Sequence, residues 1–219
     1  MRLLRRELTP AKSYLALSYC WPDTSLCIVN TPSPDNQDGG IRIPISGQLF
    51  RAAVSECMAD EGLWIDQVYI DQSNQAEKNI SIPAMAALYK NARRVLVVME
   101  DIEVDDAEQK FLENFIPEFE NSVGGTIFSR PHFGEVPAYM EKYRIFREFF
   151  NKICSSRWFT RAWCSHEMRL GQSHKFYLQC SSDSGQNANR VLAFSGEFLA
   201  YMCHLASETP TMYERIREV

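Results

Sequence analysis

Strand-like and helix-like patterns alternate along the first part of the chain, and this alternation restricts the fold more than any other feature of the sequence. Short apolar runs typical of buried strands lie at 14–21, 63–72 and 94–100. Between these runs, residues 46–62 and 81–92 carry apolar side chains at helical spacing. Strands joined by helices form parallel sheets with right-handed crossovers. The sequence therefore predicts an α/β fold with a mainly parallel sheet.

The ends of these helices are marked by capping residues and helix breakers. Ser46 is a candidate N-cap for the first helix, which we expect to stop at Gly62. Ser81 is a candidate cap for the second helix, because a proline such as Pro83 is tolerated only near the first helical turn. Residues 22–44 are rich in proline, glycine and aspartate, so we expect a long surface loop there.

Beyond the third apolar run the pattern is mainly helical. Spacing of apolar residues predicts several helices, and the last of these begins at Thr160 and ends at Gly171. Residues 174–180 then form a predicted fourth strand, and 190–206 a closing helix. The chain contains no internal repeat. We expect a single domain over 1–219, with its signature core at about 14–171 and a C-terminal strand and helix within 174–219.

Charge and cysteine content argue against several classes of protein. The formal net charge is -5 and acids cluster at 100–108, which disfavours a general nucleic-acid-binding surface. No apolar run reaches the roughly 18 residues of a membrane span, and the basic start has too short an apolar stretch for a secretory signal. We therefore expect a cytoplasmic location. In that compartment the 7 irregularly spaced cysteines are expected to be free thiols.

Candidate ligand-binding residues lie where the predicted strands end, because parallel sheets bind ligands at the carboxyl ends of their strands. The first strand ends with Ser18, Tyr19 and Trp21, and the second carries Asp66 and ends at Asp71. Aromatic rings beside carboxylates suit a nucleotide or a similar flat polar ligand. The alternative for the aromatic residues is core packing, and for the aspartate at the strand end it is capping of the next helix.

The segment 156–171, SRWFTRAWCSHEMRLG, places several reactive side chains on one helix. Trp163 and Cys164 lie four and three residues before Glu167, so all three share one side of the helix. His166 points roughly 200° away from the cysteine, which disfavours a thiolate–imidazole pair. No His/Cys cluster has zinc spacing, so no metal is expected. A carboxylate beside an indole and a thiol is partly desolvated. The alternative is a plain ion pair between this glutamate and a flanking arginine on a solvated face.

Three segments resemble, in order, the signature blocks of the fungal heterokaryon-incompatibility (HET) domain. They are YLALSYCW, LWIDQVYIDQSNQAEK with the following LYKNARRVLVV, and RWFTRAWCSHE, and they span roughly Tyr14 to Leu170. Two positions depart from the usual pattern, since Pro22 replaces a glycine in the first block and Tyr69 replaces a cysteine in the second. The loops beside both strand ends are therefore expected to differ from the common form.

The third block also resembles the WCxxE element of Toll/interleukin-1 receptor (TIR) domains. HET domains are regarded as distant relatives of TIR domains, and this implies a flavodoxin-like or TIR-like three-layer fold with additional helices. In the enzymatic branch of TIR domains, the glutamate of this element is the catalytic residue of an NAD-cleaving glycohydrolase. The resemblance thus implies that Glu167 is the catalytic carboxylate. The candidate substrate-binding residues are Ser18, Tyr19, Trp21, Asp66, Asp71, Trp163 and Cys164.

Cleavage of the nicotinamide–ribose bond needs only one carboxylate. Ordinary glycosidases use two, because the leaving alkoxide must be protonated. Nicotinamide is cationic in NAD and departs neutral, so one carboxylate can stabilise the oxocarbenium-like ribose. The first hypothesis is therefore a cell-death-associated NAD(P) glycohydrolase with NAD as its substrate, no cofactor, and self-association through the HET domain. The second is a non-catalytic homotypic interaction module in fungal non-self recognition.

Overall fold

The computed structural model describes residues 2–3, 13–20, 27–30, 40–43, 45–71, 73–122, 136–181 and 190–217. The strands are β1 (Arg2–Leu3), β2 (Tyr14–Tyr19), β3 (Cys27–Asn30), β4 (Gly40–Ile43), β5 (Gly62–Trp64), β6 (Arg94–Val104), β7 (His174–Cys180) and β8 (Val191–Ser195). The helices are α1 (Gly47–Val54), α2 (Asp66–Tyr69), α3 (Gln75–Asn91), α4 (Asp106–Ser122), α5 (Val136–Cys154), α6 (Arg157–Thr160), α7 (Ala162–Leu170) and α8 (Gly196–Arg217).

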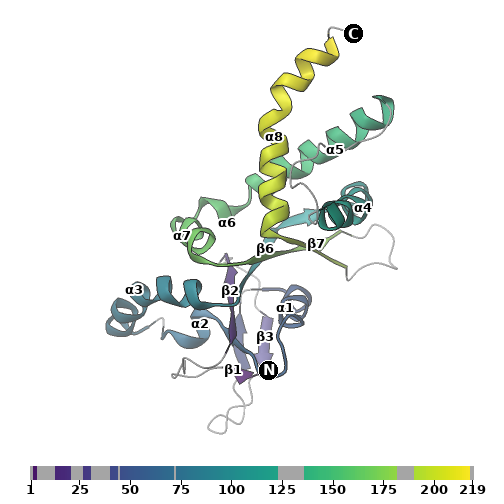
Figure 1. The fold of residues 1–219 in the computed structure, drawn as a ribbon. Coiled ribbons are helices and arrows are strands. Elements are labelled where there is room, and N and C mark those ends of the chain that lie inside the picture. Colours follow the sequence, from purple (N-terminus) through teal and green to yellow (C-terminus); the bar gives the residue numbers. More distant parts are fainter. Residues whose placement is uncertain are drawn as a thin grey trace.

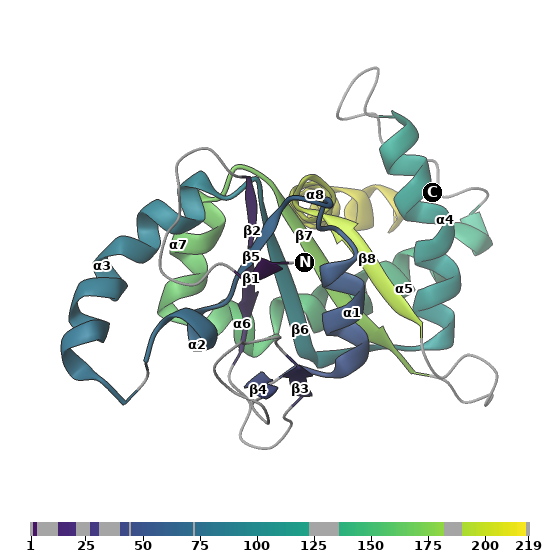
Figure 2. The same ribbon diagram turned by 90° about the horizontal axis from the view of Figure 1, so that it is seen from below.

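A 6-stranded sheet with the order β1-β5-β2-β6-β7-β8 forms the centre of the molecule. Its neighbouring strands are parallel except for β7 and β8, which are antiparallel. Counted from β2, the central strands follow the order second, first, third, fourth, as in flavodoxin-like doubly wound folds. Helix α1 covers one face, and α4, α5 and α8 lie on the other (Figures 1 and 2). The predicted three-layer α/β fold is confirmed.

Both faces of the central strands are buried, and successive side chains enter different cores. On β2 the side chains of Leu15 and Leu17 join a core shared with α1, whereas Ala16 joins the larger core on the opposite face. The same division separates Leu96 from Val97 on β6. Successive Cβ atoms of a strand point to opposite faces, so a strand covered on both sides must be apolar at every position. This is why residues 94–100 carry a continuous apolar run rather than an alternating one.

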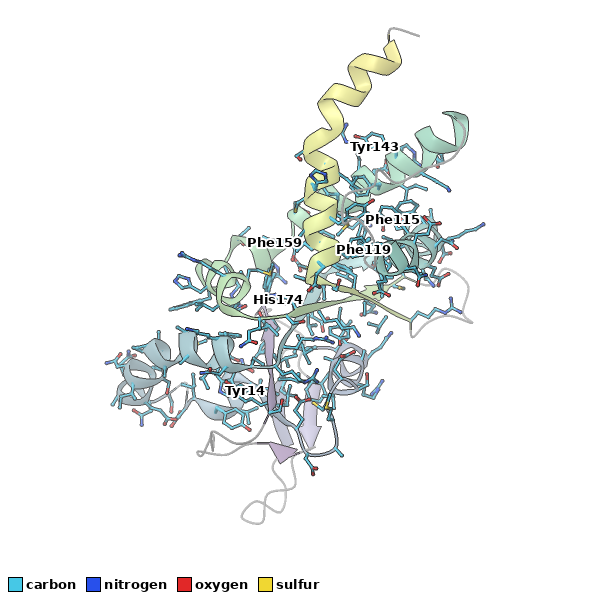
Figure 3. The ribbon with its side chains drawn as sticks, viewed as in Figure 1. Tyr14, Phe115, Phe119, Tyr143, Phe159 and His174 are labelled. Atoms are coloured by element: carbon cyan, nitrogen blue, oxygen red, sulfur yellow. The ribbon has the colours of Figure 1, made fainter. Side chains whose placement is uncertain are left out.

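The larger core is rich in aromatic rings contributed by α4, α5 and α8. Phe115 and Phe119 on α4 belong to this layer, as Figure 3 shows. The ring of Phe119 stacks on that of Tyr201 from α8, with centroids 4.8 Å apart. Offset aromatic pairs of this kind contribute roughly 0.5–1.5 kcal/mol beyond the area they bury. Helices α4, α5 and α8 therefore share one hydrophobic core with this face of the sheet.

The second strand is much shorter than predicted. Strand β5 ends at Trp64, and Asp66 begins the short helix α2 instead of continuing the strand. The apolar and aromatic residues that suggested a longer strand pack sideways, since the Trp64 ring lies 6.4 Å from Tyr69 and 5.5 Å from Tyr89. An apolar run of this length cannot distinguish a buried strand from a buried turn. As a result the strand ends at Trp64, two residues before Asp66, and Asp71 lies beyond α2.

The predicted start of the second helix is also wrong. Helix α3 begins two turns earlier, because the side chain of Asn74 accepts hydrogen bonds from the backbone of Ala76 and Glu77 at 3.0 and 3.1 Å. Ser81 is consequently not a cap, and Pro83 lies inside the helix. Pro83 has no N–H to donate to the carbonyl of Asn79 one turn earlier, and Asn79 is exposed to solvent, so the proline costs less here than in a buried helix.

Several other element boundaries differ from the sequence predictions. The first helix, α1, ends at Val54 rather than near Gly62, and the segment expected to be one long loop contains the antiparallel pair β3–β4. The segment before α7 is split, because Ser156 caps the short helix α6 and Arg161 separates it from α7. Thr160 is thus not the N-cap, whereas Gly171 is confirmed as the C-cap.

The start of the segment expected to be a closing helix is a strand. Residues 191–195 form β8, which pairs antiparallel with β7, and the helix begins only at Gly196. The burial of these five residues alternates along the strand, as expected for an edge strand with one face on the core. The short run was too brief for its period to be recognised beside the long helical pattern that follows.

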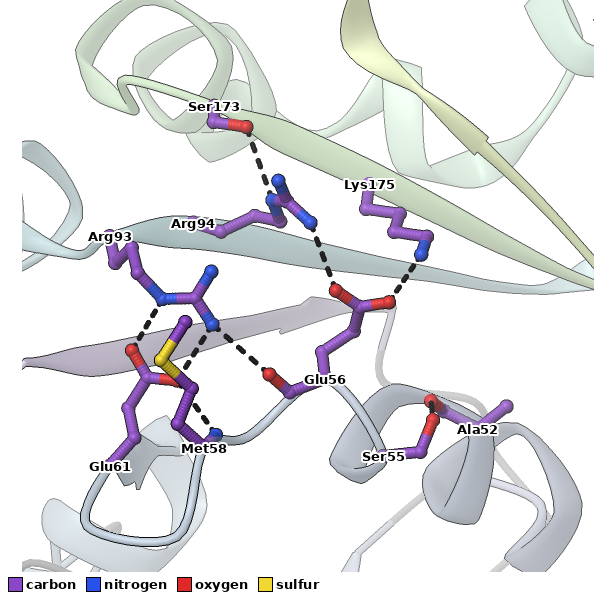
Figure 4. Close-up of polar contacts among 9 residues, drawn as sticks. All are labelled: Ala52, Ser55, Glu56, Met58, Glu61, Arg93, Arg94, Ser173 and Lys175. Atoms are coloured by element: carbon purple, nitrogen blue, oxygen red, sulfur yellow. Dashed lines mark hydrogen bonds and ion pairs between the residues drawn. The ribbon is translucent and has the colours of Figure 1, made fainter.

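A network of ion pairs ties the loop after α1 to β6 and β7 (Figure 4). Arg93 donates two hydrogen bonds to the Glu61 carboxylate, at 2.5 and 2.7 Å, and these lower the pKa of Glu61 to about 2. Glu56 pairs with Arg94 at 2.9 Å and also with Lys175. The network lies where parallel strands begin, opposite their carboxyl ends, and it fixes this end of the sheet.

Two further sequence predictions concern free cysteine thiols and membrane-spanning helices. The cysteines whose side chains the structure describes are free: Cys20, Cys57, Cys154, Cys164, Cys180 and Cys203. Cys27 lies outside the described side chains. Within the described part of the chain, no helix is both long and apolar enough to cross a membrane.

Candidate functional site

A cavity of about 140 Å³ opens where β2 and β5 end, next to α3 and α7. This is the position at which doubly wound sheets bind ligands. Its wall is formed by residues of β2, α2, α3 and α7 and of the segments that adjoin α2 and α7. The lining residues are Leu17, Ser18, Tyr19, Asp66, Ile70, Lys78, Ile82, Met85, Tyr89, Arg161, Trp163 and Glu167. The structure therefore brings Ser18, Tyr19, Asp66, Trp163 and Glu167 together, as the sequence analysis expected.

Helix α7 is held at this cavity by close contacts at its C-terminal end. The backbone carbonyl of Glu167 lies 3.0 Å from Nε2 of His174, the first residue of β7. Gly171 lies against the same imidazole, since a Cβ at this position would approach Nε2 to 2.7 Å and Val95 Cγ2 to 2.7 Å. The glycine thus allows α7 to turn directly into β7. This close packing fixes the position of the C-terminal end of α7, and with it Glu167, relative to the sheet.

The Glu167 carboxylate is buried and held by a chain of hydrogen bonds. Glu167 is only 3% exposed, and the Ser18 hydroxyl donates a hydrogen bond to its Oε2 atom. Trp158, which is fully buried, donates its indole N–H to the Ser18 oxygen at 2.7 Å. The Ser18 oxygen accepts a hydrogen bond from the indole N–H. The single proton of the Ser18 hydroxyl is then donated to the Glu167 carboxylate. The alternative of a solvated ion pair for Glu167 is therefore wrong.

Burial raises the pKa of Glu167 above its usual range. Removal from water disfavours the charged form, and the negative charge of Asp66 adds to this effect. Hydrogen bonds from Ser18 and Tyr89 and the positive charge of Arg161 act in the opposite direction. Burial prevails, so this carboxyl group binds a proton more tightly than an exposed glutamate does. A raised pKa within a cavity is typical of functional carboxylates.

The second carboxylate of the cavity, Asp66, is paired with a tyrosine. The hydroxyl of Tyr19 donates to Oδ1 of Asp66. Burial, reinforced by this neighbouring carboxylate, raises the pKa of Tyr19, so the phenol keeps its proton. Arg161, between α6 and α7, donates a hydrogen bond to the backbone carbonyl of Tyr19 and places its positive charge at the same wall. Tyr19 is thus both buried, as the core-packing alternative held, and part of the cavity wall.

Two other predicted site residues, Cys164 and Asp71, lie outside the wall of this cavity. Cys164 is buried and its thiol donates to the carbonyl of Trp158, while burial raises its pKa to about 12. It packs α7 against α6 and stays a thiol. Asp71 is exposed after α2, where its carboxylate accepts from the backbone and hydroxyl of Ser73. Trp21 lies outside the described residues.

Sequence reasoning missed Lys78 and Tyr89 of α3 as cavity residues, and it missed the role of Trp158. Tyr89 lies within residues 81–92, which the sequence analysis treated only as a helix with apolar side chains at helical spacing. Its place beside Glu167 follows from the contact between α3 and α7, which no sequence period reveals. Trp158 could have been selected as a site residue only because it lies in the third signature segment, RWFTRAWCSHE. That segment supplies both the carboxylate and, through this indole, part of its support.

Comparisons with known proteins identify the family of this sequence. Residues 14–167 match the family model described as heterokaryon incompatibility protein (HET). In a match 114 positions long that covers 47% of the chain, the sequence is 27% identical to a Neurospora crassa protein named heterokaryon incompatibility protein 6, OR allele. The match spans 16% of that relative's length. No solved structure matches the chain significantly. The family match covers more than half of the chain and includes both the strand end at Ser18 and the helix that carries Glu167, so this protein belongs to the heterokaryon incompatibility (HET) family.

Proposed function

We propose that this domain is an NAD glycohydrolase that acts in heterokaryon incompatibility and the associated cell death, with Glu167 as its catalytic carboxylate. One observation carries the proposal: a buried carboxylate with a raised pKa faces a cavity at the carboxyl ends of the sheet strands. The family assignment supports the incompatibility role, and the relative's printed name agrees with it. A cavity lined by polar and aromatic side chains is typical of small-molecule sites and supports the proposal.

The reaction breaks the bond between the ribose C1′ and the nicotinamide nitrogen. The bonding electron pair goes to the nitrogen, so nicotinamide leaves as a neutral molecule and a positive charge develops on the ribose. The Glu167 carboxylate stabilises that charge through its own negative charge. A water molecule then bonds to C1′ and gives up one proton, which Glu167 accepts. A carboxylate with a raised pKa is a better base for this second role than an ordinary one.

The remaining polar groups orient the substrate. Asp66 and Tyr19 form a hydrogen-bonded pair on the wall of the cavity and are suited to contact ribose hydroxyls. Ser18 is a positioning residue in this proposal, because its hydroxyl is shared between Trp158 and Glu167. The exposed ring of Trp163 offers a stacking surface at the rim of the cavity.

Purified protein incubated with NAD tests the proposal through nicotinamide release. Glu167→Gln keeps the shape of the side chain and removes its charge, so we expect turnover to fall roughly 100-fold or more. Glu103→Gln is a matched control, because Glu103 is an exposed glutamate on β6. Equal activity of wild type and Glu167→Gln, with both folded, would assign the chemistry to another group. Assays at several protein concentrations show whether activity depends on assembly.

Exposed apolar side chains favour a second candidate function, that of a homotypic interaction module. Ile80 is 76% exposed on α3, and Trp163 is 42% exposed on α7. Large exposed apolar side chains are enriched at protein–protein interfaces. We expect Ile80→Lys to weaken self-association measured by sedimentation. Assembly that proceeds without any consumption of NAD would favour this module over the hydrolase.

A further inference from the structure

Two cavities meet at Glu167, and their walls differ in chemistry. The second cavity measures about 220 Å³ and lies between α3 and α7. It shares one wall with the cavity described above. The shared residues are Ile82, Met85, Tyr89, Trp163 and Glu167. The carboxylate is therefore placed at the boundary between two compartments, where one bond of a ligand that occupies both would lie beside it.

The positive charges lie in the first compartment. Lys78 of α3 and Arg161 belong to its wall alone, together with Asp66 and Tyr19. A lysine and an arginine on one wall suit a diphosphate, while the aspartate suits sugar hydroxyls. Arg161 donates one hydrogen bond to the Tyr19 carbonyl. A guanidinium has five N–H donors in all, so this bond does not use up its capacity to bind a phosphate. The first compartment is thus equipped for the anionic, hydroxyl-rich part of a dinucleotide.

The second compartment is mainly apolar. The residues found only in its wall are Pro83 and Ala86 of α3, and His166 and Leu170 of α7. The aromatic rings of Tyr89 and Trp163 belong to the shared wall. Apolar walls with aromatic rings bind flat, neutral, aromatic molecules well, and they bind phosphate poorly.

From this asymmetry we propose that the compartment between α3 and α7 is the subsite for the departing aromatic base, while the first compartment holds the ribose and diphosphate of the same substrate. This assignment rests on the proposed glycohydrolase function. It gives the substrate one direction in the site, with its phosphates toward Lys78 and its base toward Ala86. Glu167 then lies beside the bond that joins the two parts.

The polarity of the base subsite also favours the reaction. A pyridinium ring is a cation, and placing it against apolar walls has a desolvation cost. This cost disappears as the ring takes up the bonding electron pair and becomes neutral. The subsite therefore binds the transition state and the neutral product better than it binds the substrate, and this difference is what accelerates a reaction.

Binding measurements on the intact domain test the assignment without requiring turnover. The probes are nicotinamide and ADP-ribose, titrated separately and followed by NMR shifts. Ala86→Phe fills the base subsite from an exposed helix position, and Ala87→Phe is its matched control on the neighbouring exposed position of α3. Lys78→Ala removes a cation from the other compartment. Loss of one well-placed charged or packed contact weakens binding roughly tenfold.

We expect a crossed pattern. Ala86→Phe weakens nicotinamide roughly tenfold and leaves ADP-ribose within about twofold, whereas Lys78→Ala does the reverse, and Ala87→Phe changes neither. Equal weakening of both probes by one variant, the opposite assignment, or no binding of either probe would overturn the proposal. If the crossed pattern appears but NAD is never consumed, the hydrolase proposal fails, and the two compartments stand only as binding sites for the base and for the ribose and diphosphate. If NAD is consumed without the crossed pattern, only the subsite assignment fails.

Discussion

The hydrogen-bond chain from Trp158 through Ser18 to Glu167 makes a quantitative prediction about Ser18→Ala. Both the serine and the indole are buried, at 2% and 0% exposure. Removing the hydroxyl leaves the indole N–H without a partner, which costs about 1–3 kcal/mol, and removes a hydrogen bond to a carboxylate, worth about 1.5–3 kcal/mol. We expect the free energy of unfolding at pH 7 to fall by about 3–5 kcal/mol. The carboxylate also loses a donor, so its pKa rises further.

A double-mutant cycle with Trp158→Phe isolates the unpaired indole. The phenyl ring has no N–H, so in the double variant no donor is left unsatisfied. We therefore expect Ser18→Ala to cost about 1–3 kcal/mol less in the Trp158→Phe background than in the wild type. Urea unfolding at pH 7, followed by circular dichroism, gives the four free energies. Additivity of the two single changes within about 0.5 kcal/mol would refute the reasoning, because it would mean that the indole and hydroxyl are not coupled.

The other predictions concern pH and packing. Since the pKa of Glu167 lies above its ordinary value of 4.5, activity should fall on the acid side at a pH above that value, as a pH–rate profile will show. Glu61→Gln should lower the free energy of unfolding at pH 7 by about 2–3 kcal/mol, and the difference should disappear as pH falls from 4.5 toward 2. Gly171→Ala should destabilise by about 1–3 kcal/mol in urea, because its Cβ meets the His174 ring.

Controls for these predictions exist within the chain. Glu120→Gln removes an exposed carboxylate of α4 and should leave the free energy of unfolding unchanged within about 0.5 kcal/mol. A Cβ on Gly196 would lie 3.1 Å from His174 Cβ, so Gly196→Ala should cost less than Gly171→Ala. A Glu61→Gln difference that persists at pH 2, or an acid limb at or below pH 4.5, would contradict the pKa directions assigned to Glu61 and Glu167.

The sheet could be predicted because its central strands are covered on both faces. Long buried strands such as β6 require continuous apolar sequence, and this separates them from amphipathic helices. Strands of a few residues lack such a signal. Both β5, which ends at Trp64, and β8, at 191–195, were therefore misjudged in length or type. Helix starts were misjudged where a cap lay upstream of the apolar pattern, as Asn74 does before α3.

The site was predictable in part for a geometric reason. Local periods predicted that Ser18 and Tyr19 lie at a strand end and that Glu167 shares a helix face with Trp163. Only the family resemblance suggested that Glu167 belongs to the same site, and the structure places all of them on one cavity. Contacts between helices do not follow from local periods. Tyr89 and Lys78 reach the cavity only because α3 lies beside α7, so no sequence pattern singled them out.

The cavity is assembled from segments that lie far apart in the chain, since the hydrogen bond between Ser18 and Glu167 joins residues 149 positions apart. Its wall also needs α3, which belongs to the crossover between β5 and β6, and α7, which precedes β7. During synthesis on the ribosome, the domain therefore has no complete pocket until its last parallel strand has docked. A cytotoxic activity located there would stay silent in any chain whose synthesis has not yet reached α7, and folding itself would be its first safeguard.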